Sequence, residues 1–254
     1  MIKTDQPTLF DRTKLLSAVS SKEDGSMKIL HGNVLQAVAY REQFLKRLGT
    51  TLDDAVLLYV GDQTVWDAIR DVDNQDRGAG MRDPSTAITG DALVTNQKGI
   101  VLFLYTADCN AIIIHDPVHE VVALVHLGWQ STAVDLAGKV IAHLQRHYGS
   151  APADLLIYNG PSIRAESYVL EPPLAQMGLP GWEPYLIELP GGTISVDLLR
   201  YNRQQFIDAG VLEDHMEVCP IDTARSADYF SHYRANRQGK AADEGRFVTV
   251  CMLR

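Results

Sequence analysis

One cysteine and one histidine within residues 104–130 have the types and the spacing that metal or nucleophilic chemistry needs. Between them, Asp116-Pro117 is typical of the first two positions of a type I turn joining two antiparallel strands. A turn centred after Pro117 pairs residues whose numbers sum to about 235, so Cys109 lies opposite His126. Directly opposed side chains on one sheet face have Cβ atoms roughly 4.5–5.5 Å apart. We therefore predict that the thiol and the imidazole meet.

Three interpretations of this pair are open from spacing alone. A cysteine sulfur and a histidine nitrogen are ligands that bind Zn²⁺ at about 2.3 and 2.1 Å. Without metal, the pair gives an activated thiol, because an adjacent imidazole lowers the pKa of a cysteine. The third interpretation is a buried cysteine at a polar strand end, without chemistry. His115 and His119 flank the turn and are expected at the surface.

A predicted helix start lies close to the same pair. The chain runs from His126 through Leu-Gly-Trp-Gln to Ser131, where the helix is expected to begin. Unpaired backbone N–H groups and the positive end of the helix dipole favour an anion there, such as phosphate or a developing oxyanion. Ordinary capping by Ser131 is the alternative, and both can hold. Ser131 is therefore a candidate phosphate-binding residue.

Apolar strands and amphipathic helices must position these residues. Apolar spacing predicts a helix over 34–49, a Ser/Thr start and a Gly stop predict another over 131–149, and 195–210 is a third. Strands are predicted over 54–63, 91–96, 99–116, 120–129 and 154–163, and residues 230–253 are predicted as a loop that closes into a last strand. Strands and helices do not alternate strictly. We predict an α+β fold: one layered domain over residues 1–254, with mixed β-sheets flanked by helices.

Two stretches between these elements are predicted as loops. Residues 67–90 are charged and glycine-rich and are expected to be mostly surface loop. Residues 171–192 are rich in proline and glycine and form the most plausible hinge. They do not separate two compositional regimes, so one domain is retained.

Composition limits the partners. The formal net charge is −9 and the pI about 5.3, without a basic block, so we expect no nucleic-acid partner. No apolar segment reaches roughly 18 residues, and no signal peptide is recognisable, so we expect no membrane association. Three cysteines, Cys109, Cys219 and Cys251, are too few and too far apart for a disulfide framework, which favours a cytoplasmic location. The oligomeric state is not predicted.

Several segments resemble, in order, the laccase-domain family, whose members are also called multicopper polyphenol oxidase or purine nucleoside phosphorylase–type proteins. The most specific are "TADC", which ends at Cys109, and "HLGW", which begins at His126. "VLQAVAYREQFLKRLG", "GPSI...SYVLE", "DLLRYNRQQFIDAGV" and "CPIDTARSADYFSHYR" support them over about residues 33–250. The resemblance implies one α+β domain with a zinc ion held by His, Cys and His. It also implies phosphorolysis of adenosine, inosine or methylthioadenosine, and deamination of adenosine.

The resemblance carries roles over to five residues. Cys109 and His126 match two of the three zinc ligands. Asp108 in "TADC" matches an acid beside the metal, which could act as a general acid or base. Arg41 in the helix motif and Arg234 in "FSHYR" match arginines that could contact phosphate or substrate.

The chain departs from the family at the first zinc ligand. That ligand is the histidine of a "QVH" segment, whereas this chain reads "GDQTVWDAI". An ungapped alignment places Asp62 at the ligand position, and a shifted one places Val65 there. Carboxylate oxygen is an accepted zinc ligand, so the predicted set is Asp62, Cys109 and His126. His232, an additional histidine in "FSHYR", is a candidate for compensation.

Four functions remain open. The first is a zinc-dependent purine nucleoside phosphorylase or adenosine deaminase-like enzyme that takes a nucleoside and phosphate. The second is a copper oxidase of phenols, which the eight histidines do not favour because none stand in a His-x-His pair. The third is a metal-free hydrolase with Cys109 as nucleophile and His126 as base. The fourth is a nucleoside-binding protein without catalysis. We predict the first, with zinc favoured over copper.

Overall fold

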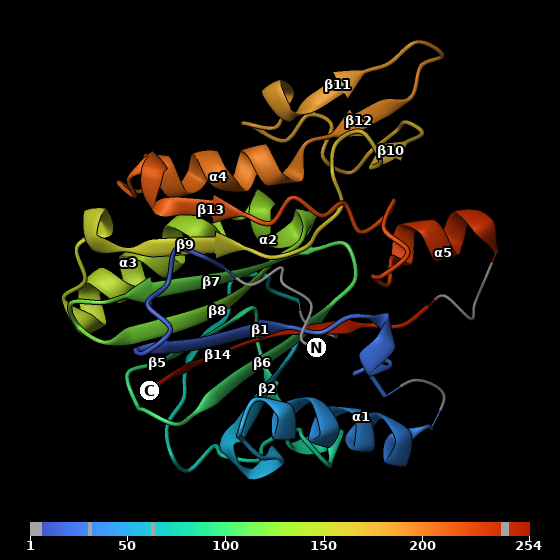
Figure 1. Cartoon of the computed structure of the whole chain (residues 1–254). Coiled ribbons are helices and arrows are strands. Elements are labelled where there is room, and N and C mark those ends of the chain that lie inside the picture. Colours follow the sequence, from blue (N-terminus) through green and yellow to red (C-terminus); the bar gives the residue numbers. More distant parts are fainter. Residues whose placement is uncertain (1–6, 30–31, 62–63, 240–243) are drawn as a thin grey trace.

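Two β-sheets packed face to face form the centre of the computed structural model, which describes residues 7–29, 32–61, 64–239 and 244–254 (Figure 1). The first sheet has the order β1 (Leu15–Val19), β14 (Phe247–Leu253), β6 (Val101–Thr106), β2 (Ala55–Tyr59) and β4 (Ile88–Thr89). The second has the order β13 (Met216–Val218), β9 (Leu156–Asn159), β7 (Asn110–Asp116), β8 (Val121–Leu127), β5 (Ala92–Thr95) and β3 (Ile69–Asp71). Both sheets contain parallel and antiparallel pairs.

The central strands are continuously apolar because both of their faces are buried. In β6, Leu102 and Leu104 pack between the two sheets, whereas Val101 and Phe103 pack on the outer face. In β7, Ile113 lies between the sheets, and its neighbours on either side face outward. This alternation within an unbroken apolar run is typical of sheets covered on both sides.

Helices cover the outer faces of both sheets. The helix α1 (Val34–Arg47) packs on the first sheet, and α3 (Leu136–Tyr148) and α4 (Leu198–Asp208) pack on the second (Figure 1). Two shorter helices, α2 (Trp129–Ala133) and α5 (His232–Gln238), flank the end of the second sheet that carries Cys109. Single 3₁₀ turns span Lys22–Asp24, Leu52–Asp54, Pro84–Thr86, Pro152–Asp154, Glu183–Tyr185 and Glu213–His215. The predicted α+β class with layered, mixed sheets flanked by helices is confirmed.

A third, antiparallel sheet stands over α4 at the top of the view in Figure 1. Its order is β10 (Val169–Leu170), β12 (Ile194–Val196) and β11 (Leu186–Glu188). Trp182 is fully buried beneath it, with Val196 and Leu198 around it. Much of the stretch predicted as a hinge, 171–192, therefore belongs to this small cap, which has its own apolar cluster.

Residues 67–90 are mostly loop, as predicted, but they also contain the short strands β3 and β4, which pair in parallel with β5 and β2. One prediction about a helix is wrong in detail. The predicted helix 131–149 is two helices, because Asp135 adopts a left-handed φ of 54° between them. Its carboxylate accepts a hydrogen bond from Gly138 N and caps α3. Sequence periodicity continues through this break and therefore does not reveal it.

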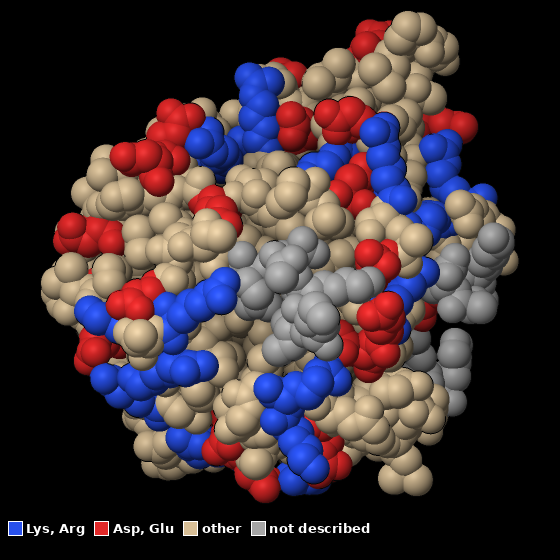
Figure 2. Space-filling view, in the orientation of Figure 1, with Lys and Arg blue, Asp and Glu red and all other residues tan. Residues whose placement is uncertain are grey.

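Basic side chains are not gathered in one block along the sequence, and the surface visible in Figure 2 shows the same distribution. Figure 2 shows acidic and basic side chains interspersed on the visible face, without a broad basic patch. Within the described ranges, no helix is long and apolar enough to cross a membrane.

Candidate active site

The β7–β8 hairpin positions Cys109 and His126, with a register that differs from the predicted one. His126 pairs with Ala111, because a four-residue loop, 117–120, replaces the two-residue turn. The loop ends at Glu120, whose left-handed φ of 52° leads into β8. The predicted direct opposition of Cys109 and His126 is therefore wrong by two residues. A shift of two keeps a side chain on its face, whereas a shift of one would reverse it, so the two residues are diagonal neighbours.

The two side chains converge beside Gly128. A Cβ atom on Gly128 would lie 3.5 Å from Cys109 Sγ and 3.6 Å from His126 Nε2. The sulfur and the nitrogen can therefore be no further apart than the sum of these two distances. The same Cβ would lie 3.2 Å from His126 Cε1, closer than most side chains tolerate. Glycine at this position keeps the space between the two donor atoms open.

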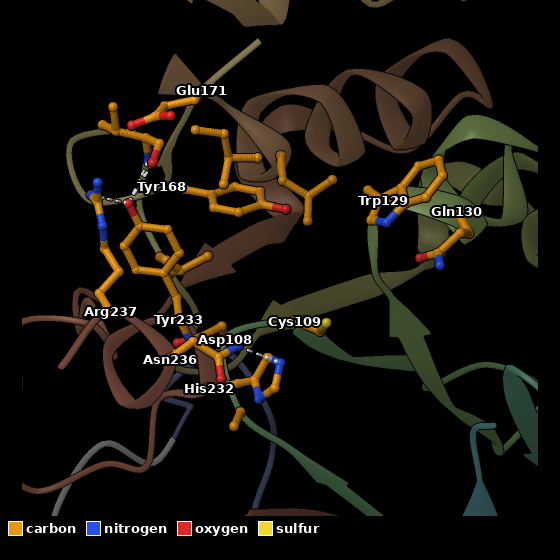
Figure 3. Close-up of a pocket in the computed structure, with 15 residues that line it drawn as sticks. Asp108, Cys109, Trp129, Gln130, Tyr168, Glu171, His232, Tyr233, Asn236 and Arg237 are labelled. Carbon is orange, nitrogen blue, oxygen red and sulfur yellow. Dashed lines mark hydrogen bonds between the residues drawn. The ribbon is translucent and has the colours of Figure 1, made fainter. Parts of the chain in front are cut away.

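A cavity of about 600 Å³ opens over Cys109 (Figure 3). Asp108 and Cys109 lie at its floor, and Trp129 enters from α2. The cap contributes Tyr168 and the strand β10, and α5 lies beside the cap, across the cavity from Trp129. A cavity of this size, walled mainly by apolar and aromatic groups with a few polar ones, is typical of small-molecule sites.

Burial determines the charge of the Cys–His pair. It lowers the pKa of His126 to about 4. It raises the pKa of Cys109 to about 11, and the neighbouring carboxylate of Asp108 adds to this. At neutral pH the pair is thus a thiol and a neutral imidazole, not the thiolate–imidazolium pair of an activated cysteine nucleophile. A neutral imidazole is the form that binds a metal, and a thiol gives up its proton on binding one.

Asp108 connects the cavity floor to α5. Its carboxylate accepts hydrogen bonds from Thr223 Oγ1 at 2.6 Å and from the backbone N of Tyr233 at 2.7 Å. Its backbone is left-handed, with φ 83°, a conformation that costs a non-glycine residue energy. Only 8% of Asp108 is exposed, so the side chain lies between the cysteine loop and the start of α5. Both carboxylate oxygens are engaged by the protein itself.

The structure does not bring Arg41 to the cavity. The arginine is 1% exposed beneath α1, on the far face of the first sheet. Its guanidinium donates to the carbonyl oxygens of Met27, Gly80 and Met81 at 2.8–2.9 Å and lies over the Phe103 ring. These contacts use three of the five N–H donors of the guanidinium, and its burial keeps it away from a phosphate in the cavity.

Arg234 and Ser131 lie near the cavity but donate to backbone atoms. Arg234 donates to carbonyl oxygens at four positions of a preceding loop, namely Thr223, Ala224, Ser226 and Tyr229. It therefore fixes the loop that supplies the Thr223 hydroxyl to Asp108. Ser131 is 1% exposed, and its hydroxyl accepts from Gly128 N and donates to the carbonyl of His126. The helix α2 begins at Trp129 with Gly128 as its N-cap, so Ser131 is the third residue of the helix and not the predicted N-cap. Its hydroxyl closes a capping box with Gly128 N.

The described residues supply two of the three predicted zinc ligands. Asp62 lies outside the described residues. Among those that are described, no group of three His, Cys, Asp or Glu side chains is arranged to hold a metal ion. His232 lines the cavity, but its ring nitrogens contact Glu244 Oε1 at 3.3 Å and Asn236 Nδ2 at 3.0 Å. The sulfur and nitrogen at Gly128 are nevertheless donors that zinc prefers.

Comparison with known families decides where this hairpin and cavity belong. The model of the family described as multi-copper polyphenol oxidoreductase laccase matches residues 27–254. The chain belongs to this laccase family.

Several relatives of this laccase-family chain carry a functional name. Purine nucleoside phosphorylase YlmD of Bacillus subtilis is 27% identical over 223 residues, or 86% of this chain and 79% of that protein. Purine nucleoside phosphorylase YlmD of Geobacillus stearothermophilus is 34% identical over 172 residues, or 65% of this chain and 63% of that protein. A crystal structure of YlmD from Geobacillus stearothermophilus has a TM-score of 0.83 and 26% identity, covering 98% of this chain and 94% of that one.

The laccase-family cavity contains residues that the sequence did not single out. Trp129 and Tyr168 belong to the motif segments "HLGWQ" and "SYVLE", and their aromatic type beside a predicted ligand was the available signal. Tyr233 and Arg237 lie on α5, in a stretch predicted as loop. Nothing in the local pattern distinguished Arg237 from a surface arginine.

Proposed function

We propose that this chain is a zinc-dependent purine nucleoside phosphorylase acting on adenosine, inosine or methylthioadenosine, with deamination of adenosine as a second reaction. The observation that carries the proposal is the Cys109–His126 pair: the two side chains approach each other at Gly128, and Cys109 lies on the floor of a cavity with aromatic walls. The reaction class is supported by the names of the relatives in Bacillus subtilis and Geobacillus stearothermophilus, which are both called purine nucleoside phosphorylase.

The aromatic and apolar walls suit a purine nucleoside. Trp129 and Tyr168 present their rings to the cavity from opposite sides of its mouth (Figure 3). Ile163, Leu170 and Leu198 add aliphatic surface. A planar base is held well by such groups, because stacking on an aromatic ring is worth about 1–3 kcal/mol per base. These residues bind and orient the base and exclude water from it.

Cys109 and His126 are the described residues that would hold the zinc ion. Asp62 is proposed as the third ligand from the sequence alignment alone. A zinc ion supplies a Lewis acid that polarises a substrate oxygen or nitrogen, or lowers the pKa of a bound water. The neutral imidazole of His126 offers its lone pair without losing a proton, whereas Cys109 releases one proton when it binds the ion. Soft thiolate and imidazole donors favour zinc in this pair over hard cations.

Asp108 is proposed to hold the cysteine loop in place. Its contacts with Thr223 and Tyr233 fix the conformation of the residue before Cys109. The direction in which the sulfur points then depends on a carboxylate that is anchored at both oxygens. Its anchoring supports a positioning role more strongly than the general acid–base role suggested by the family motif.

The proposal is tested by incubating adenosine, inosine and methylthioadenosine with phosphate and separating the products by HPLC. We expect free base and a ribose 1-phosphate, together with about one zinc per chain by elemental analysis. Cys109→Ser and His126→Asn should lose zinc and about 100-fold or more of the activity, because a metal contributes several kcal/mol to such a reaction. His147→Asn, at an exposed histidine of α3, is the matched control and should retain both. Unchanged nucleosides in every mixture, with added zinc and with phosphate, would overturn the proposal.

A further inference from the structure

The described residues that line the cavity include one lysine or arginine side chain, Arg237. The two arginines of the family motifs, Arg41 and Arg234, donate to backbone carbonyl oxygens instead. A phosphorylase needs a group that holds an anion, and a guanidinium matches phosphate oxygens well. Arg237 is therefore the candidate that the geometry selects.

Arg237 is held in position by its own helix. Its Nη1 donates to Tyr233 Oη at 2.6 Å, and its guanidinium carbon lies 5.3 Å from the centroid of the Tyr233 ring. Tyr233 Oη in turn donates to the carbonyl oxygen of Val169 in the cap. The guanidinium has five N–H donors, and the contact with Tyr233 is the one it makes among the described residues. The remaining donors are available to a ligand at an orientation that is already fixed.

Two other polar residues of α5, His232 and Asn236, line the cavity together with Arg237 (Figure 3). Asn236 uses one amide hydrogen on His232 Nε2 and has a second hydrogen for an acceptor. The cavity also contains two carboxylates. Asp108 already accepts two hydrogen bonds, whereas the exposed Glu171 has no partner among the described residues and opposes an anion.

We propose that α5 carries the inorganic phosphate site of this cavity, with Arg237 as the cationic ligand and Asn236 beside it. The inference rests on the proposed phosphorylase function. It assigns the co-substrate to α5, which lies beside the cap and across the cavity from Trp129 (Figure 3), so Tyr233 links the phosphate site to the cap through Val169. The negative charge of Glu171 repels phosphate and so weakens its binding.

The test measures binding of inorganic phosphate and kinetics on the same zinc-supplemented proteins. Equilibrium dialysis with radiolabelled phosphate needs no turnover, and the KM for phosphate is measured where turnover exists. Arg237→Gln should weaken phosphate binding, or raise its KM, about tenfold or more, with the KM for nucleoside almost unchanged. Arg237→Lys should recover part of the loss, and Glu171→Gln should tighten binding. Arg82→Gln, an exposed arginine paired with Asp53, is the control and should change nothing.

The outcomes separate the two proposals. Phosphate binding that depends on Arg237 in a protein without turnover would support the site and defeat the phosphorylase proposal. Turnover by the wild type with the same KM for phosphate in Arg237→Gln would overturn the site and leave the phosphorylase intact. A wild type that neither binds nor consumes phosphate overturns both. Equal weakening by Arg82→Gln would show a general charge effect and would also overturn the site.

Discussion

Polar groups are treated differently in the core beneath α1 and in the cavity. Beneath α1, the Arg41 guanidinium is enclosed, and three carbonyl oxygens accept its hydrogen bonds. At the cavity floor, Cys109 lies next to His126 beside Gly128, and the buried Nδ1 of His126 has no hydrogen-bond partner in the described structure. Both regions bury ionisable groups close to a β-sheet. The region beneath α1 provides hydrogen-bond partners for its buried group, whereas the region around His126 does not.

The presence or absence of hydrogen-bond partners distinguishes buried polar groups that stabilise the fold from those that can bind a ligand. A buried polar group with a full set of partners has spent its hydrogen-bonding capacity on the fold. A buried polar group without partners costs stability and is retained where a ligand uses it. By this criterion Arg41 is structural, although its position in a family motif suggested a substrate contact. His126 keeps a buried nitrogen without a protein partner, and the Cys109 thiol lies next to this imidazole.

The largest effect that sharpens this contrast is expected at Arg41. Arg41→Met should lower the free energy of unfolding by about 3 kcal/mol, because it leaves three carbonyl oxygens without their donor. Urea unfolding followed by circular dichroism measures this loss. Arg41→Lys keeps the charge and part of the hydrogen bonding, so its free energy of unfolding should lie between those of Arg41→Met and the wild type. A stable Arg41→Met protein with a raised KM for phosphate would contradict the structural role.

A smaller effect is expected from acid on the metal-free protein. The pKa of His126 is lowered to about 4 by burial, from an ordinary value of about 6.5. Folding therefore favours the neutral imidazole, and this contribution is present above pH 6.5 and is lost as the pH falls towards 4. Linkage gives about 2 kcal/mol of lost stability at pH 5. His115, predicted at the surface, is buried instead, and burial lowers its pKa too, so a variant is needed to isolate the effect of His126.

His126→Asn isolates that contribution. Urea unfolding in the presence of a chelator, at pH 7 and pH 5, should show a smaller acid loss in the variant than in the wild type. His147→Asn, at an exposed position on α3, should retain the full acid loss. Equal losses in all three proteins would mean that His126 is charged as easily in the fold as in the unfolded chain.

Much of the fold could be predicted because its central strands carry strong local signals. Apolar runs such as 100–105 and 111–114 identify strands that are buried on both faces, and α1 follows from its spacing. The break at Asp135 and the short parallel strands β3 and β4 depend on tertiary contacts with no local pattern. The hairpin register failed for a related reason, because a four-residue loop with a left-handed Glu120 resembles a shorter turn in sequence.

The site could be predicted as far as the pair but not as a whole. The face shared by Cys109 and His126 followed from the two-residue period of strands, which survives a register error of two. Arginine roles did not follow, because the sequence does not reveal whether a guanidinium meets carbonyl oxygens or open space. Arg41, expected to contact phosphate or substrate, is buried against carbonyl oxygens, whereas Arg237, for which no role was predicted, lines the cavity.

The smallest expected effect concerns Asp108, which distinguishes positioning from proton transfer. Asparagine tolerates the left-handed backbone, its carbonyl can accept from Tyr233 N, and its amide can donate to the Thr223 hydroxyl. Asp108→Asn should therefore keep the activity within about threefold and leave the pH profile unchanged. Asp108→Ala loses both contacts, strains the backbone by about 1–2 kcal/mol, and should lower activity and zinc content together.

The pair of variants is decisive because asparagine copies the shape of aspartate but cannot exchange a proton. Steady-state rates across pH 5–9 for both variants, with zinc content measured in parallel, give the answer. If Asp108→Asn is as inactive as Asp108→Ala while its zinc content stays normal, Asp108 transfers a proton and the positioning role is wrong. Thr223→Val removes one of the two anchors and tests the same contact from the other side. Because the second anchor at Tyr233 N remains, its effect should fall between those of the asparagine and alanine variants.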